Sequence, residues 1–213
     1  MTMTPLEISR VTETLCRKAP VIPVLVIEDA THAAPLAEAL IAGGLPVLEV
    51  TLRTPAALDA IAAMSGVPGG IVGAGTVLTP DDVRAAQDAG AQFAVSPGAT
   101  DRLLDACEAA GLPILPGAAT ASEAMRLLER GYGVQKFFPA SAIGGAPALK
   151  ALGGPLPQVR FCPTGGIDTA NAADYLALDN VLCVGGSWVA PRQLVQKGEW
   201  AAITGLARQA AAL

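Results

Sequence analysis

Two kinds of segment alternate along the whole length of the chain. Short apolar segments rich in β-branched residues recur, and stretches of Ala and Leu with helical periodicity separate them. Alternation of strand and helix in this order favours a parallel sheet covered by helices. The segments that we expect to form strands are residues 21–27, 47–51, 71–74, 93–96, 114–115, 134–138, 160–163 and 181–184.

The ends of the helical segments support this division. Residues 79–82 (Thr-Pro-Asp-Asp) combine a capping hydroxyl, a first-turn proline and two acids, while Thr120 and Glu123 have capping-box spacing. The segments with the clearest helical pattern include residues 34–42, 56–64, 83–89, 103–110, 121–128 and 170–178. Glycines follow several of them, where we expect the left-handed conformation that closes a helix: Gly43, Gly90, Gly111 and Gly131.

Eight such units predict a (β/α)8 TIM barrel, because their spacing is nearly uniform and no break divides the chain into halves. An open doubly wound sheet is the alternative. No polar linker or low-complexity segment interrupts the chain, so we expect residues 1–213 to form a single domain. Residues 4–7 (Thr-Pro-Leu-Glu) predict an extra N-terminal helix. The segment 114–115 is the weakest strand because prolines bracket it.

Composition argues against several function classes. No apolar run reaches the ~18 residues of a membrane span, and the first residues lack the basic and apolar regions of a secretory signal. A net charge of -5 without a cluster of Lys and Arg argues against a nucleic-acid partner. The hydrophobic fraction of 52% predicts a large core and is compatible with subunit interfaces.

The cysteines point to a reducing compartment. The four cysteines have no close pairs, and the chain has one histidine. This argues against a zinc cluster or a Cys-His nucleophile and indicates reduced core thiols. We therefore expect a cytoplasmic protein whose chemistry needs no metal and no cofactor.

Lys136 is the residue that most directly indicates chemistry. It lies in residues 133–139 (Gly-Val-Gln-Lys-Phe-Phe-Pro), at the end of an expected buried strand, whereas the other three lysines lie at helix ends or in polar stretches. A desolvated lysine amine loses proton affinity and becomes a usable nucleophile near neutral pH. We therefore expect Lys136 to be catalytic.

Glu49 is expected to accompany it. The two-residue repeat of a strand sends Val47, Glu49 and Thr51 to one face, and the opposite face would bury the carboxylate against a helix. We therefore expect Glu49 to point inward, near Lys136, where it could move protons in carbonyl chemistry. A structural ion pair between the two side chains is the alternative.

Residues after the second and third strands could hold a substrate carboxylate. Arg53 could grip it with two hydrogen bonds, and residues 73–76 (Gly-Ala-Gly-Thr) could add backbone amides and a hydroxyl. A surface ion pair for Arg53 and a tight turn for the glycines are the alternatives.

Glycines after the last two strands suggest a phosphate site. They occur in residues 162–166 (Cys-Pro-Thr-Gly-Gly) and 185–187 (Gly-Gly-Ser). Phosphate sites in barrels frequently form from the loops after strands seven and eight, where backbone N–H groups converge. The alternative is that these glycines only turn the chain. We expect Trp188 and Phe138 to be packing residues.

Five blocks of the chain are distinctive: residues 44–53 (Gly-Leu-Pro-Val-Leu-Glu-Val-Thr-Leu-Arg), 73–76, 96–98 (Ser-Pro-Gly), 136–139 (Lys-Phe-Phe-Pro) and 161–166 (Phe-Cys-Pro-Thr-Gly-Gly). Together they closely resemble the class I 2-keto-3-deoxy-6-phosphogluconate aldolases, a group that also includes 4-hydroxy-2-oxoglutarate aldolases. The resemblance covers nearly the full chain, and the blocks around Glu49 and Lys136 are specific, whereas the flanking helices are not diagnostic. Residues 141–143 lie in a loop outside the five blocks.

The resemblance implies a role for each candidate residue. Lys136 would form a Schiff base and Glu49 would be the acid/base. The residues implied in substrate binding are Arg53 and Thr76 on the pyruvyl carboxylate, Pro97 lining that pocket, Phe138 against the imine and Thr164 near the sugar hydroxyls. The residues implied in phosphate binding are Gly165, Gly166, Gly186 and Ser187.

The resemblance also implies an activity and an assembly. The chain would be a lyase that cleaves 2-keto-3-deoxy-6-phosphogluconate to pyruvate and glyceraldehyde 3-phosphate, with a (β/α)8 fold and a homotrimeric state. Its galactonate epimer and 4-hydroxy-2-oxoglutarate remain possible substrates, and Thr164 favours the first compound.

Two other functions remain open from the residues alone. A phosphosugar isomerase could use Glu49 as base and Lys136 as an electrostatic group on the same barrel. A non-catalytic protein could hold a phosphorylated sugar, although a buried lysine and carboxylate lower stability without an evident structural gain.

Overall fold

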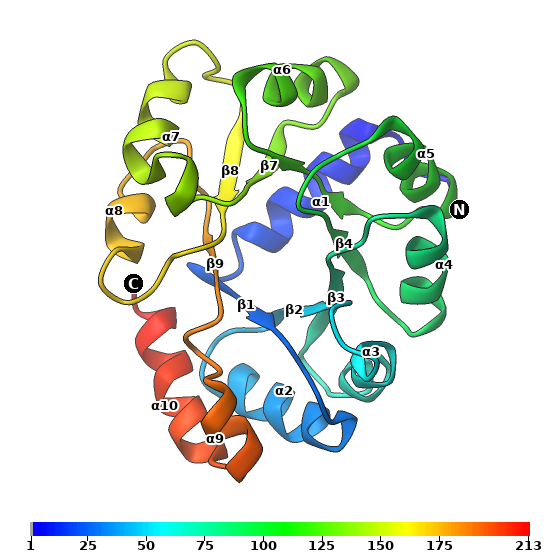
Figure 1. Cartoon of the computed structure of the whole chain (residues 1–213), viewed down its shortest axis with the longest axis vertical. Helices are drawn as coiled ribbons and strands as arrows, with labels where there is room; N and C mark the ends of the chain where they lie inside the picture. Colours follow the sequence, from blue (N-terminus) through cyan, green and yellow to red (C-terminus); the bar gives the residue numbers. More distant parts are fainter. Residues whose placement is uncertain (1) are drawn as a thin grey trace.

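Helices surround a curled parallel sheet in the computed structural model, which describes residues 2–213 (Figure 1). The strands are β1 (Val21–Leu25), β2 (Val47–Thr51), β3 (Ile71–Gly75), β4 (Phe93–Val95), β5 (Ile114–Leu115), β6 (Gly117–Ala118), β7 (Val134–Phe137), β8 (Arg160–Pro163) and β9 (Val184–Gly186). The α-helices are α1 (Pro5–Cys16), α2 (Ala33–Ala42), α3 (Ala57–Ser65), α4 (Pro80–Asp88), α5 (Asp101–Ala110), α6 (Ala121–Arg130), α7 (Gly145–Gly153), α8 (Ala172–Leu176), α9 (Arg192–Lys197) and α10 (Trp200–Ala211). Two short 3-10 helices are η1 (Ala30–His32) and η2 (Ser141–Ile143).

The strands pair in two parallel groups. One has the order β5-β4-β3-β2-β1-β9, and the other has the order β6-β7-β8. Only Pro116 separates β5 from β6, and isolated parallel bridges join Phe161 of β8 to Val181 ahead of β9, and Thr164 after β8 to Gly185 of β9. All carboxyl ends therefore lie at one end of the sheet, as the alternation of strand and helix predicts.

All eight predicted strand segments overlap strands, three of them with an end that differs by one residue, and three others differ more. The first strand ends at Leu25, because the chain leaves the sheet at the exposed Val26. The fifth segment continues past Pro116, which has no N–H to donate, and so divides into β5 and β6. The last strand begins only at Val184, since Val181 makes an isolated bridge to Phe161.

The helix predictions were incomplete and one cap was wrong. Capping boxes form at Thr79 and Thr120, as their spacing predicts. The named segments do not include α7, α9 and α10, whose glycines or short length weaken the periodic pattern. Gly43 has φ -84°, so the left-handed residue after α2 is Gly44 with φ +95°. Gly43 instead allows the end of α2 to pack closely against α10, because a Cβ there would lie 2.3 Å from Cβ of Ala207 on α10.

Two apolar clusters occupy the two faces of the sheet. The larger one lies between sheet and helices and contains Leu48 and Val50, while the smaller one lies inside the curl and contains Val47. The two-residue repeat of β2 explains this division. Glu49 follows Val47 on the inner face, as predicted, and is 3% exposed.

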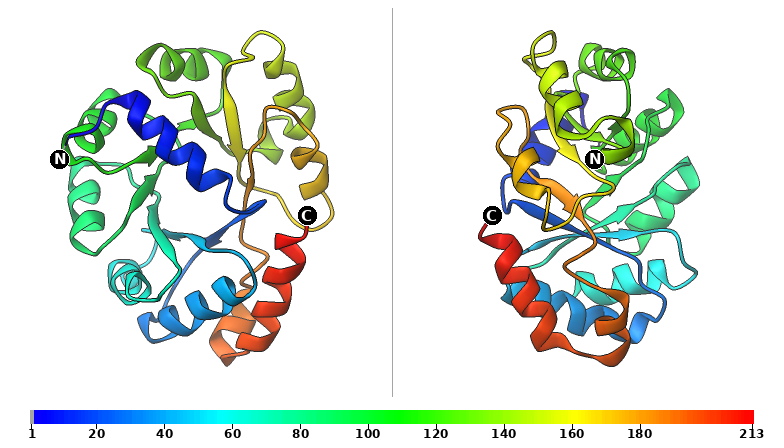
Figure 2. Two further views of the ribbon diagram at one scale, coloured as in Figure 1. Left: turned by 180° about the vertical axis from the view of Figure 1, so that it is seen from behind. Right: turned by 60° about the vertical axis from the view of Figure 1, so that its left-hand side comes forward.

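Helix α1 packs against the amino end of the sheet. Seen from behind, it crosses the sheet diagonally (Figure 2). Leu15 and Cys16 at its carboxyl end belong to the inner apolar cluster, together with Ile22 and Val134 at the starts of strands. Ser9 Oγ accepts hydrogen bonds from the N–H groups of Gly133 (3.0 Å) and Val134 (3.2 Å). The predicted extra helix thus covers the end of the sheet away from the carboxyl ends of the strands.

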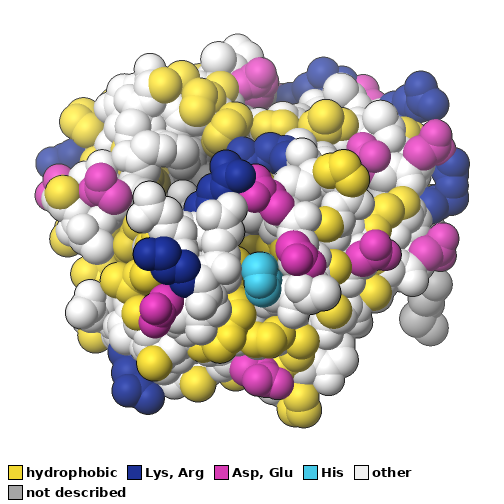
Figure 3. Space-filling view, turned by 60° about the horizontal axis from the view of Figure 1, so that its bottom comes forward, with side chains coloured by type: hydrophobic (Ala, Val, Ile, Leu, Met, Phe, Trp, Pro, Cys, Tyr) yellow, Lys and Arg dark blue, Asp and Glu magenta, His cyan; other side chains and the backbone are white. Residues whose placement is uncertain are grey.

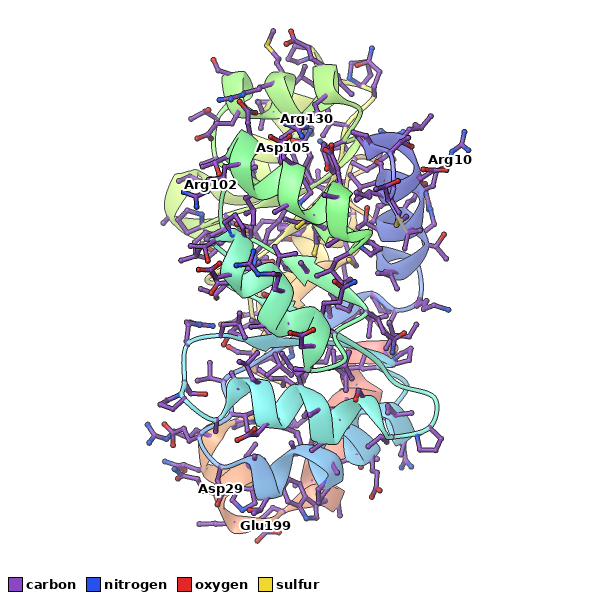
Figure 4. The ribbon with its side chains drawn as sticks, turned by 90° about the vertical axis from the view of Figure 1, so that its right-hand side faces the viewer. Arg10, Asp29, Arg102, Asp105, Arg130 and Glu199 are labelled. Atoms are coloured by element: carbon purple, nitrogen blue, oxygen red, sulfur yellow. The ribbon has the colours of Figure 1, made fainter. Side chains whose placement is uncertain are left out.

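An ion-pair cluster joins α5 and α6 on the outside. Arg130 pairs with Glu108 at 2.9 Å and with Asp105, which lies beside it in Figure 4. Tyr132 donates a hydrogen bond of 2.8 Å to the same Glu108. No helix of the described chain is both long and apolar enough to cross a membrane.

Ser9→Ala should lower the free energy of unfolding by about 1–3 kcal/mol, because the N–H groups of Gly133 and Val134 lose their acceptor. Denaturant titration measures the change. Thr14→Ala is the matched control, since it removes an exposed hydroxyl of the same helix, and it should stay within about 0.5 kcal/mol of the parent. Equal stability of the two variants would contradict an anchoring role for Ser9.

Candidate active site

A cavity of about 340 Å³ lies at the carboxyl ends of the strands. Eleven residues proposed for the site from the sequence line it, from six different strands or the loops that follow them, whereas Gly73, Ala74 and Gly75, whose amides were also proposed, lie within β3 and outside the lining. The eleven are Glu49, Arg53, Thr76, Pro97, Lys136, Phe138, Thr164, Gly165, Gly166, Gly186 and Ser187. The structure therefore brings all eleven residues together, although it does not by itself assign their roles.

Lys136 and Glu49 meet inside this cavity. Lys136 is the third residue of β7 and Glu49 the third residue of β2, and their side chains are 6% and 4% exposed. Lys136 Nζ donates to Glu49 Oε1 at 3.2 Å. The same nitrogen lies 5.4 Å from the centroid of the Phe138 ring, within the range of a cation–π contact. The amine thus has one carboxylate and one aromatic face as neighbours in a water-poor setting.

Glycines on neighbouring strands make room for the polar side chains. A Cβ at Gly75 would lie 2.3 Å from Glu49 Oε1, and a Cβ at Gly185 would lie 2.3 Å from Thr164 Oγ1. Thr164 is 6% exposed, and its hydroxyl has no hydrogen-bond partner among the described residues. A buried hydroxyl without a partner is costly unless a ligand satisfies it. Thr164 lines the cavity, so its hydroxyl is a candidate to bind a molecule there.

Arg53 and Thr76 lie near the mouth of the cavity. Arg53 is exposed, and within residues 2–213 it forms no ion pair, so the surface-pair alternative is not observed there. Thr76 has φ +60°, the one described non-glycine residue with a positive φ. A β-branched residue in this conformation is strained, and such strain concentrates at functional sites.

The loop after β8 presents unused backbone donors. Gly165 and Gly166 both have positive φ, +101° and +71°. The N–H groups of Gly166 and Ile167 donate to no acceptor within the described chain, and both residues line the cavity. Successive N–H groups in such a turn form a concave anion site. The exposed Ser187 contributes a hydroxyl from the loop after β9.

Gly186 has a structural reason to be glycine. A Cβ on it would lie 1.7 Å from Cζ3 of Trp188, so the indole ring packs directly over the glycine backbone. The packing role predicted for Trp188 agrees with this contact. Phe138 likewise packs against Gly165, where a Cβ would lie 3.3 Å from its ring.

A larger cavity of about 630 Å³ lies beside the site and shares Val24 and Ser187 with it. His32 and Trp188 line this cavity, which contains neither Lys136 nor Glu49. Figure 3 shows the histidine in cyan with hydrophobic side chains in yellow and acidic side chains in magenta around it. Size alone would select this cavity, but the smaller one contains the only buried lysine of the described residues and is the better candidate.

The cavity lining contains four residues that were not among the eleven predicted from the sequence. Val24, Thr51, Ile167 and Gly185 also face the cavity. Thr51 lay on the predicted inner face of β2, so the two-residue repeat could have found it. Within residues 2–213 no group of three or more His, Cys, Asp or Glu side chains is arranged to hold a metal ion.

A buried lysine beside a carboxylate, at the carboxyl ends of parallel strands, defines an α/β protein with a candidate amine nucleophile. The family model described as KDPG and KHG aldolase matches residues 12–206. The chain belongs to this family. It is 55% identical over 196 residues to the 2-dehydro-3-deoxy-phosphogluconate aldolase of Pseudoalteromonas atlantica, with 92% of this chain and 91% of that protein covered.

Two solved structures extend the comparison. The 2-keto-3-deoxy-6-phosphogluconate aldolase of Zymomonas mobilis, with 3-phosphoglycerate, has a TM-score of 0.92 and 53% identity, covering 96% of both chains. The KDPG aldolase of Legionella pneumophila has a TM-score of 0.90 and 49% identity, covering 93% of this chain and 97% of that one. The latter contains pyruvate captured at low pH as a covalent carbinolamine intermediate.

Gly75→Ala should separate Lys136 from Glu49, because the added methyl group would overlap the carboxylate. We expect a crystal structure of the variant to show the Nζ to Oε1 distance beyond hydrogen-bond range. Gly98→Ala is the matched control at the same end of the sheet, since a Cβ there meets no atom within 4 Å. An unchanged distance in Gly75→Ala would show that Glu49 can hold its contact without the space that glycine provides.

Proposed function

We propose that the chain is a lyase that cleaves 2-keto-3-deoxy-6-phosphogluconate (KDPG) to pyruvate and D-glyceraldehyde 3-phosphate through a Schiff base. The observation that carries this proposal is the buried amine of Lys136, 3.2 Å from Glu49 in an accessible cavity. Family membership and the covalent pyruvate adduct of the Legionella pneumophila relative support it. The family description also supports activity on 4-hydroxy-2-oxoglutarate (KHG).

The first half of the reaction forms the imine. The uncharged amine of Lys136 attacks the C2 ketone and gives a carbinolamine, which loses water to become an iminium ion. Glu49 supplies and removes the protons that these steps need, because its carboxylate already contacts the amine. The Phe138 ring, 5.4 Å from Nζ, faces the positive charge that the iminium carries.

The second half breaks the carbon–carbon bond. A base removes the proton of the C4 hydroxyl, the C3–C4 bond breaks, and its electron pair moves toward the iminium nitrogen to form an enamine. Glyceraldehyde 3-phosphate leaves with a new aldehyde group. Protonation of the enamine at C3 and hydrolysis of the resulting imine then release pyruvate and restore Lys136. Glu49 is the carboxylate within reach of Lys136 that can move these protons.

The remaining residues of the cavity position the substrate. We assign the pyruvyl carboxylate to Arg53 and Thr76, with Pro97 lining that end and Phe138 packing against the imine. Thr164, whose hydroxyl lacks a partner, receives a sugar hydroxyl. Gly165, Gly166, Gly186 and Ser187 form the phosphate end. The free N–H groups of the loop after β8 and the 3-phosphoglycerate of the Zymomonas mobilis relative support that end of the assignment.

We further propose that residues 1–213 form one closed (β/α)8 TIM barrel domain. Its closure would run from β8 to β9 through the bridges Phe161 to Val181 and Thr164 to Gly185, and from β9 to β1 through regular pairing. On the other side, β5 and β6 would be one strand bent at Pro116. These contacts support a complete ring of eight strand positions.

We also propose a homotrimer in the cytoplasm. The trimer rests on the family resemblance, and exposed apolar side chains such as Leu6 and Leu78, 56% and 53% exposed, are compatible with contacts between subunits. The compartment rests on the four cysteines, all free and buried. Light scattering of the purified protein tests the assembly.

Borohydride added with pyruvate should reduce the imine and attach a stable mass to the peptide that contains Lys136. The buried amine is expected to react in preference to the three solvent-accessible lysines because the cavity holds pyruvate against it. Peptide mass spectrometry locates the adduct, and Lys136→Arg is the control that should give none. Modification of another lysine instead would defeat the assignment.

Lys136→Arg also separates the proposal from the isomerase alternative. Arginine keeps the positive charge but cannot form the imine, so aldol cleavage should disappear. The relatives compared above are all described as aldolases, which favours cleavage over isomerisation or binding alone. Activity on a phosphosugar that this variant retains would support the isomerase alternative.

Glu49→Gln should slow pyruvate release by about 10²–10⁴-fold, because the amide cannot exchange protons. Pyruvate should still occupy the cavity, since the amide preserves shape and Arg53 holds the carboxylate. Steady-state assays and calorimetric titration with pyruvate measure the two effects separately. Unchanged turnover would remove Glu49 from the mechanism.

A further inference from the structure

The turn at Gly165 and Gly166 depends on support from outside itself. Both residues have positive φ, in a loop where Gly166 is exposed. Glycine loses more conformational freedom on ordering than any other residue, so two in succession give a turn that is costly to hold in one conformation. Hydrogen bonds from neighbouring segments hold this turn in place.

Three successive carbonyl groups of this loop accept hydrogen bonds from neighbouring segments. The N–H of Ala140 donates to Thr164 O at 2.8 Å, and the N–H of Ser141 donates to Gly165 O at 3.0 Å. The carbonyl of Gly166 accepts two side-chain hydrogen bonds, at 2.7 Å from Ser141 Oγ and at 2.9 Å from Asn171 Nδ2.

These bonds determine where the N–H groups point. In a trans peptide unit the C=O and the following N–H point in opposite directions. Fixing the Gly165 carbonyl therefore fixes the N–H of Gly166, and fixing the Gly166 carbonyl fixes the N–H of Ile167. Both N–H groups lack an acceptor within residues 2–213, and both residues line the active-site cavity. The orientation of the anion-binding donors is thus set by residues on the far side of the loop.

A buried tyrosine extends the network. Tyr175 on α8 is 3% exposed, and its hydroxyl lies 3.2 Å from Ser141 Oγ. Asn171 is braced as well, because its Oδ1 accepts the N–H of Asp168 at 3.0 Å while its Nδ2 holds Gly166 O. A Cβ on Gly166 would lie 2.6 Å from Ser141 Cβ, so the serine also packs tightly against the turn.

We propose that Ser141, Asn171 and Tyr175 are positioning residues that orient the Gly165-Gly166 turn toward the substrate phosphate and so select phosphorylated over unphosphorylated 2-keto acids. The inference rests on the proposed aldolase function and adds residues that do not contact substrate. Ser141 lies in the 141–143 loop, which matched none of the sequence blocks. Its hydroxyl holds the carbonyl of Gly166, and this fixes the direction of the Ile167 N–H in the same peptide unit.

The test compares two substrates in three variants. In S141A and N171A the KM for KDPG should rise about five- to tenfold, the factor expected for losing one hydrogen bond to the turn. The kcat should stay within about twofold, because Lys136 and Glu49 are untouched. With the unphosphorylated KHG, both constants should remain at the parent values. Y175F should show a smaller rise in KM for KDPG, since it acts through Ser141.

Inorganic phosphate provides a readout that is independent of turnover. Its dissociation constant, measured by calorimetric titration, should rise in S141A and N171A by the same factor as the KM for KDPG. T204V is the matched control, because Thr204 Oγ1 donates to Ala39 O at 3.0 Å on α2, away from the cavity. It should leave the kinetic constants and phosphate affinity unchanged.

Two results would overturn the positioning role: equal losses with both substrates, or phosphate affinity that does not change. Ser141 is exposed, so S141A decides the question even where N171A lowers stability. Failure of the aldolase function looks different, because the parent protein would then release pyruvate from neither substrate. In that case weaker phosphate binding by the variants would still support the positioning of the turn.

Discussion

The contact between Lys136 Nζ and Glu49 Oε1 is the interaction on which the site depends. It joins β7 to β2, which are not neighbours in either sheet, so it exists only because the sheet curls until inward-facing side chains meet. Both side chains are almost completely buried, and a lone charge in that position would be far more costly than a pair. The environment of the Lys136 amine therefore depends directly on the curvature of the sheet.

Glycines inside the sheet make room for the polar side chains of the site. Gly75 leaves room for the Glu49 carboxylate, and Gly185 leaves room for the Thr164 hydroxyl. Nearer the amino ends of the strands the interior is apolar, with Val47 and Val134 packed against Leu15 and Cys16 of α1. The interior is thus divided into a packed half that stabilises the fold and a polar half that can receive a ligand. This division agrees with the rule that parallel α/β proteins carry their sites at the carboxyl ends of strands.

Much of the site could be predicted from the sequence because its signals are local. The two-residue repeat of β2 placed Glu49 inside, and a lone lysine in an apolar strand identified Lys136. The glycines of the loop after β8 were predicted from the sequence to form a phosphate site, but the side chains that support this loop were not predicted. Asn171 contacts Gly166 from five residues further along an irregular loop, and Tyr175 contacts Ser141 across 34 residues of sequence; neither kind of contact produces a periodic pattern in the sequence. The break between β5 and β6 has a local cause, since Pro116 has no N–H to donate, whereas the late start of β9 reflects the isolated bridge of Val181 to Phe161; both appeared only in the structure.

The position of α1 has a consequence for the order of events. This helix and the inner apolar cluster fill the amino end of the sheet, while Gly166 and Ser187, which we assign to the phosphate end of the site, are exposed at the carboxyl end. On the proposed mechanism the three-carbon acid is bound covalently to the buried Lys136, and the phosphorylated fragment lies above it, toward these exposed residues. The upper fragment must therefore depart first during cleavage. In the synthetic direction the keto acid must load before its aldehyde acceptor, so the architecture itself imposes a sequential kinetic scheme.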